Sequence, residues 1–237
     1  FFTPGVPFEF KQMVREQILP RLKALAAEET DTELRRFYTF GISESALSDK
    51  LDAAPWPAGI ELGYRSSMPL IELKLIGHSA SAADMDAAEA RLLGEITPWL
   101  VGQGNEEPAQ QILSLLGARP LYLQEGESRG ALLAMCHPHP GLEASFSHNL
   151  PSELDQLTGG GQEPCLTIGN AGPGGVPLLL CADGQRIGQR VKLSHPDPES
   201  GRRILAFAAL DMLRRHLLGL PVLADYLTLT RTASRID

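Results

Sequence analysis

A glycine-rich loop, TIGNAGPGGV at residues 167–176, has the composition of a phosphate-binding turn. Successive backbone N–H groups can approach an anion closely where few side chains intervene. The residues that would form such a nucleotide site are Gly169, Ala171, Gly172, Gly174 and Gly175, together with Ser128. The alternative interpretation is that the glycines serve a tight turn between buried strands.

Possible nucleophiles and bases lie just upstream of this loop. Ser128, Ser145, Ser147 and Ser152 each carry a hydroxyl, but caps and turns use most serines of this kind. His148 is adjacent to Ser147, yet neighbouring residues of a strand point to opposite faces. The CHPHP stretch at 136–140 has zinc-ligand chemistry, but its prolines indicate an extended loop and no second ligand pair has the spacing of a zinc site. We predict no metal site and no cofactor.

The bulk composition narrows the function further. The 237 residues are 43% hydrophobic and carry a net charge of −8, which is typical of a globular protein and disfavours nucleic-acid binding. No apolar run approaches the roughly 20 residues that span a bilayer, so no membrane association is expected. The three cysteines form no CxxC motif and indicate reduced thiols in a cytoplasmic protein.

The periodicity of apolar residues predicts two units that position these groups. An α+β unit contains a strand at 34–41, a helix from Ser43, strands at 59–67 and 70–77, and a helix from Ser81. After a linker at 102–108, helices alternate with strands, which predicts a three-layer α/β domain. Its last strand, 185–194, is expected at the sheet edge, and its last helix spans 200–220.

At the start of the chain, FFTPGVP is interpreted as a strand entering a turn. A helix at 9–28 follows, kinked or divided by Pro20. Because a strand needs a partner sheet, we expect that a larger N-terminal domain has been removed.

Several stretches resemble the CinA (competence/damage-inducible) family. TPGVPFEFKQMV followed by ILPRL is similar to the end of its molybdopterin-binding-like domain, FGISESALSDKL and GYRSSMPLIELKL to its KH-like domain, and IGNAGPGG to the glycine loop of its C-terminal domain. The resemblance implies a domain tail at 1–29, a KH-like domain at 30–101, a C-terminal domain at 108–220 and a tail at 221–237. It also implies a homodimer.

The family's C-terminal domain is a nicotinamide-nucleotide (NMN) amidohydrolase with a Ser nucleophile in an ESCTGG motif and a downstream Tyr and Lys. The matching stretch here is EGESRG at 125–130, which places Gly126, or Glu127 after a one-residue shift, at the nucleophile position. Phe146 stands where the Tyr belongs and Pro151 where the Lys belongs. In any register, residues 124–190 contain no Tyr and no Lys.

These losses predict that the C-terminal domain is degenerate and inactive, because removing one catalytic group commonly costs orders of magnitude in rate. Its remaining role would be structural, dimerising or pyridine-nucleotide binding. Two alternatives stay open. One is an active amidohydrolase that uses Glu127, Ser128, Ser147 and His148 at one pocket. The other is an ADP-ribose pyrophosphatase activity in the missing N-terminal domain.

Overall fold

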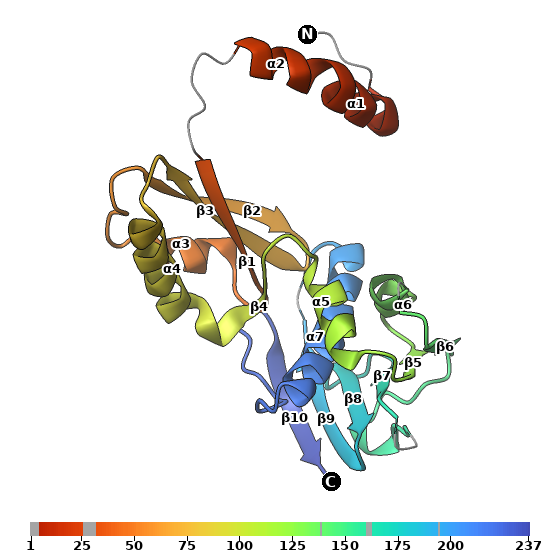
Figure 1. Ribbon diagram of the computed structural model, residues 1–237. Helices are drawn as coiled ribbons and strands as arrows, with labels where there is room; N and C mark the ends of the chain where they lie inside the picture. Colours follow the sequence, from red (N-terminus) through yellow and green to blue (C-terminus); the bar gives the residue numbers. More distant parts are fainter. Residues whose placement is uncertain (1–4, 26–31, 138, 160–162, 194) are drawn as a thin grey trace.

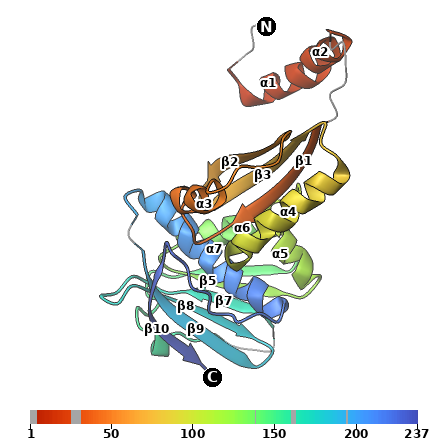
Figure 2. The ribbon, with the colours of Figure 1, turned by 90° about the vertical axis from the view of Figure 1, so that its left-hand side faces the viewer.

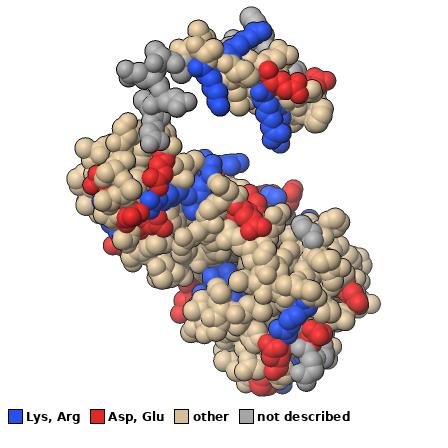
Figure 3. All heavy atoms as spheres, in the orientation of Figure 1, with Lys and Arg blue, Asp and Glu red and all other residues tan. Residues whose placement is uncertain are grey.

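The computed structural model describes residues 5–25, 32–137, 139–159, 163–193 and 195–237. It is a mixed α/β structure with two sheets, stacked with helices between them (Figure 1). None of the described helices is long and apolar enough to cross a membrane. Acidic and basic side chains are interspersed on the face seen in Figure 3, with no broad single-sign surface.

The N-terminal helix is divided as the proline predicts. It consists of α1 (Pro7–Met13), a π-helical turn η1 (Val14–Ile18) and α2 (Leu19–Leu25). Pro20 has no N–H to donate, which fits the change of hydrogen-bond register before α2. No residue of this helix is buried. The strand expected in FFTP lies outside the described residues.

The first sheet has the strand order β2-β3-β1-β4 and is antiparallel throughout. Its strands are β1 (Thr32–Thr39), β2 (Ile60–Ser67), β3 (Leu70–His78) and β4 (Leu100–Gln103). Helices α3 (Glu44–Leu51) and α4 (Ala82–Ile96) pack on one face around an apolar cluster, and η2 (Thr97–Trp99) leads into β4. The N-cap predicted at Ser43 is confirmed, because its hydroxyl accepts from the Ala46 N–H. Part of the expected linker is strand β4, which pairs with β1.

The second sheet has the order β10-β9-β8-β7-β5-β6. Strand β5 (Leu121–Glu125) is parallel to β6 (Leu142–Phe146) and to β7 (Cys165–Ile168). The pairs from β7 through β8 (Val176–Ala182) and β9 (Gln185–Lys192) to β10 (Thr230–Ile236) are antiparallel. Strand β9 is therefore interior, and the expectation of an edge strand there is wrong. The chain's C-terminal segment supplies the edge strand.

The helices of this half cover one face of the second sheet. Helices α5 (Pro108–Leu116), α6 (Ala131–Cys136) and α7 (Pro198–Leu217) contact one another, and α7 packs on β7 and β8 (Figure 2). On the other face the single turn η3 (Leu154–Gln156) and Leu157 cover Cys165, Leu179 and Cys181. The prediction of a third, helical layer is therefore corrected: a loop with one turn covers that face.

The two halves share an apolar junction. The centroid of the Phe40 ring lies 4.9 Å from the ring centroid of Phe207 on α7 and 5.0 Å from that of Tyr226. The Tyr226 hydroxyl donates to buried Asp211 at 2.7 Å, and Arg214 Nε donates to the same carboxylate at 2.6 Å. Leu227 N–H completes the junction by donating to the Gly41 carbonyl. The Asp211 carboxylate on α7 thus holds Tyr226, whose ring packs against Phe40 at the end of β1.

Replacing Tyr226 with Phe should lower the free energy of unfolding by about 1–3 kcal/mol, because one oxygen of buried Asp211 loses its donor. Tyr64→Phe is the matched control, since the Tyr64 hydroxyl donates to an exposed Asp52. It should cost about 0.5 kcal/mol or less. Urea denaturation of both variants measures the difference. Equal costs would contradict the importance given to Asp211.

The junction also predicts a dependence on alkaline pH. Burial, followed by the charge of Asp211, raises the pKa of Tyr226 well above its ordinary value of 10. The contribution of Tyr226 to the free energy of unfolding is then fully present below pH 10 and falls as the pH rises further, because its hydroxyl ionises at lower pH in the unfolded chain than in the folded one. The fall should be smaller in Tyr226→Phe, though still present, since burial also raises the pKa of Tyr38 and Tyr64. Identical slopes in urea titrations above pH 10 would refute this.

Candidate functional site

The buried carboxylate of Glu125 organises the segment after β5. It accepts hydrogen bonds from Ser128 Oγ at 2.6 Å and from the backbone N–H groups of Gly130, Leu132 and Leu133 at 3.1, 3.1 and 2.8 Å. An acidic group bonded to the first N–H groups of a helix stabilises that helix end. Glu125 therefore caps α6 and sets the course of residues 126–130.

Ser128 serves this cap. Its side chain has no exposed surface, and its hydroxyl donates to Glu125. The hydroxyl therefore does not face the glycine loop, where the sequence suggested a nucleotide contact or a replacement nucleophile.

At Gly126, one of the two positions that the resemblance aligns with the family's nucleophile, a side chain would meet neighbouring atoms. A Cβ there would lie 2.5 Å from Asn170 Oδ1 and 3.1 Å from the Gly169 backbone. Asn170 cannot simply move away, because its amide donates to the carbonyls of His148 and Leu150 at 2.9 and 2.7 Å. The position is closed by backbone and by a side chain that is held in place.

The other two family positions also lack the chemistry. Phe146 ends β6 and is 55% exposed, and the carbonyl of Pro151 accepts from the Asn170 N–H at 3.2 Å. The nearest tyrosine before residues 124–190 is Tyr122, which packs with the η3 turn on the sheet face opposite the helices. Neither position supplies a base to a hydroxyl near Gly126.

In the glycine loop, most backbone donors already have partners. Gly172 and Gly175 exchange two hydrogen bonds of 3.0 Å, Gly169 N–H donates to Pro177, and Ala171 N–H donates to Glu127 Oε2 at 3.3 Å. Among the described residues, the Gly174 amide is the one loop N–H left without a partner. A phosphate cradle needs several convergent free donors. The loop as it stands does not offer them.

Tight packing explains why these positions are glycine. Gly175 has φ +112°, and a Cβ there would overlap the Val191 carbonyl. A Cβ at Gly172 would lie 2.9 Å from Ser152 Cβ, and one at Gly174 2.6 Å from Arg190 Nη1. The tight-turn interpretation therefore accounts for the glycines without a ligand.

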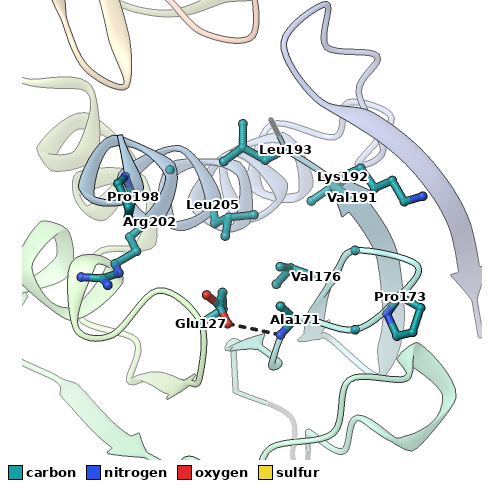
Figure 4. A pocket seen from close by; sticks show the side chains of 13 residues that line it. Glu127, Ala171, Pro173, Val176, Val191, Lys192, Leu193, Pro198, Arg202 and Leu205 are labelled. Atoms are coloured by element: carbon teal, nitrogen blue, oxygen red, sulfur yellow. Dashed lines mark hydrogen bonds between the residues drawn. The ribbon is translucent and has the colours of Figure 1, made fainter. Parts of the chain in front are cut away.

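A cavity of about 390 Å³ nevertheless lies between this loop, the end of β9 and the start of α7 (Figure 4). Glu127 reaches into it and bonds to Ala171, while Lys192 and Arg202 leave it on opposite sides. The sequence reasoning missed Lys192, because only the turn that brings β9 beside the loop places it here. The charged groups that line this cavity are one acid, Glu127, and two bases, Lys192 and Arg202, among glycine, proline and apolar residues.

The other candidate groups do not gather at this cavity. Ser147 Oγ accepts from the Asn149 N–H, and exposed His148 does not line the cavity. Buried His139 is bonded to the Arg119 carbonyl at 2.7 Å. No cluster of three metal-ligating side chains occurs among the described residues.

The cysteines are buried free thiols. Burial and then the charge of Glu125 raise the pKa of Cys136 to about 12, so this thiol stays protonated at neutral pH. A protonated thiol is a poor nucleophile.

Comparison with known proteins identifies relatives, although no family model matches the chain. CinA-like proteins of Shewanella piezotolerans and Shewanella amazonensis are 31% and 32% identical to it over 275 residues, covering 98% of this chain and 65% of each relative. The CinA-like protein of Shewanella pealeana is 33% identical over 270 residues, covering 95% of this chain and 64% of the relative. The chain thus spans just under two thirds of its relatives. The matched span of 275 residues is longer than the whole of this chain, so the relatives carry residues within it that this chain lacks.

Gly126→Ser, which restores the family's hydroxyl, should lower the free energy of unfolding by about 1–3 kcal/mol and confer no NMN hydrolysis. The new Cβ must displace Asn170 from its two carbonyl partners. The control is Gly94→Ala on the exposed side of α4, where a Cβ meets nothing within 4 Å. It should stabilise by up to about 1 kcal/mol. A Gly126→Ser variant as stable as the parent in urea would show that the position is open.

Proposed function

Because this chain belongs to the CinA-like family, we propose that it is a member whose C-terminal unit, built on the second sheet, has lost NMN amidohydrolase activity. Its role is then that of a structural or ligand-binding module. The observation that carries the proposal is the closed position at Gly126, where the backbone of Gly169 and the side chain of Asn170 exclude any nucleophile. The family resemblance indicates which reaction to expect, NMN hydrolysis. The contacts at Gly126 argue against a serine nucleophile at that position.

The missing base supports the same conclusion. A serine hydroxyl attacks an amide only when a neighbouring group takes its proton. Phe146 and Pro151 cannot do so, and residues 124–190 offer no Tyr or Lys in their place. Lys192 lines the glycine-loop cavity but leaves it on the side opposite Arg202. No described hydroxyl in that cavity is paired with a base.

A homodimer belongs to the proposal because the resemblance implies it. A cytoplasmic location belongs to it because the three cysteines form no CxxC motif. Helix α7 cannot supply the dimer interface with its apolar stripe. Residues from Ile204 to Leu213 are buried against the protein's own core. The mass in solution, measured by light scattering, tests the assembly.

Two alternative activities have less support. A replacement nucleophile would require Glu127, Ser128, Ser147 and His148 at one pocket, and only Glu127 lines the glycine-loop cavity. An ADP-ribose pyrophosphatase activity would belong to a part of the relatives that this chain does not cover.

The purified chain should release no nicotinate mononucleotide or ammonia from NMN, beside a family member with the complete Ser, Tyr and Lys set that turns the substrate over. The reason is that nucleophile and base are both absent. Turnover that persists through repurification and disappears in Glu127→Gln would contradict the proposal and assign the reaction to a replacement group.

A further inference from the structure

A second hollow, of about 460 Å³, lies next to the glycine-loop cavity and is lined by three arginines. Arg129, from the turn before α6, lines it together with Arg202 and Arg203 from the first turns of α7. Arg202 lines both cavities, so they are neighbours. The remaining wall includes Glu199 and the start of α6.

Among the described residues, these three guanidinium groups have no side-chain partner. None makes an ion pair within 4.0 Å or a side-chain hydrogen bond with any described residue, and Arg129 and Arg203 are exposed. By contrast, Arg35 bonds three carboxylates. With Glu199 the only acid in the lining, the hollow has a surplus of positive charge in a chain of net charge −8.

Arg129 also has an unfavourable backbone conformation. Its φ is +48°, and the next residue, Gly130, has φ +93°. The Ala131 N–H donates to the Ser128 carbonyl across them at 3.0 Å, which is the bond of a type I′ turn. Asn or Gly is the ordinary choice at the first of these positions. A strained arginine aimed at a hollow with two other unpaired arginines is the kind of outlier that points to function.

The neighbouring glycine loop offers an anion few free donors. Apart from the Gly174 N–H, its backbone donors are occupied within the protein, and the Glu127 carboxylate accepts from the Ala171 N–H. In the glycine-loop cavity Glu127 opposes an anion beside Lys192 and Arg202, whereas the arginine hollow has three basic side chains and one acid. Guanidinium groups bind phosphate oxygens in pairs of parallel hydrogen bonds.

We propose that Arg129, Arg202 and Arg203 form a binding site for a small phosphorylated molecule carrying at least two negative charges. The volume suits a small molecule, and the chain's overall negative charge opposes a long polyanion. The inference rests on the proposed function in one respect, that the region binds a ligand without hydrolysing it.

Calorimetric titration with inorganic pyrophosphate and with NMN tests the site. Arg129→Gln and Arg203→Gln should each weaken binding about tenfold or more, as expected for loss of a charge-assisted hydrogen bond. Arg21→Gln removes the same charge from an exposed position on α2 and should leave binding unchanged. Glu127→Gln should change binding less than either cluster variant. Stronger binding in Glu127→Gln, with no effect at Arg129, would place the anion at the glycine loop and overturn the proposal.

Arg129→Gly separates binding from folding. Glycine accepts the positive φ, so the melting temperature should stay constant or rise by about 2 °C while pyrophosphate binding weakens. Loss of binding with a lower melting temperature would indicate a purely structural arginine and contradict the proposal.

Absence of pyrophosphate and NMN binding in the parent chain would also overturn the proposal. Tight, salt-sensitive binding of single-stranded RNA at the same residues would show that the ligand is a polymer and overturn the proposal of a small molecule. NMN hydrolysis is measured in a separate assay. Hydrolysis would refute the proposed loss of activity but would not bear on binding at the three arginines.

Discussion

The carboxylate of Glu125 is the group on which the candidate site depends. It is buried and makes no ion pair with any described residue, and one hydroxyl and three backbone N–H groups donate hydrogen bonds to it in place of water. A buried charge is tolerated only with such complete hydrogen bonding. Because these donors come from Ser128 to Leu133, the same bonds fix the turn, bury Ser128 and direct Arg129 outward.

A second set of contacts joins this turn to the glycine loop. Gly126 N–H donates to the Ile168 carbonyl at 2.8 Å, and Glu127 N–H to the Gly169 carbonyl at 3.1 Å. These bonds continue the parallel pairing of β5 and β7 beyond the strand ends. Ligands of open α/β sheets bind at this carboxyl edge. Here the two loops are hydrogen-bonded to each other across this edge, and a side chain at Gly126 would meet Asn170 and the Gly169 backbone.

Local patterns were sufficient to predict most elements. Alternating apolar residues located β2 and β3, and Ser43 located the start of α3. Strand β10 was missed because TRTASRI carries no apolar alternation and is a strand only through its pairing with β9. The position of the helices on one sheet face is likewise a tertiary property that periodicity does not encode.

The candidate site shows the same division. The absence of Tyr and Lys could be read directly from residues 124–190. The burial of Ser128 could not, because it follows from a bond to a carboxylate three residues earlier. The arginine hollow was also hidden, since Arg129 and Arg203 are far apart in the sequence and meet only when α7 packs against α6.

The most direct test is a ¹⁵N NMR titration of the intact chain with inorganic pyrophosphate, following backbone amides and arginine Nε–H signals together. We predict shifts at the side chains of Arg129 and Arg203 and at the amide of Gly130. The amides of Ala171, Gly172 and Gly175 should stay in place, because their hydrogen bonds are internal. Shifts concentrated at those three amides, with silent arginines, would show that the glycine loop is a working phosphate cradle and contradict this account.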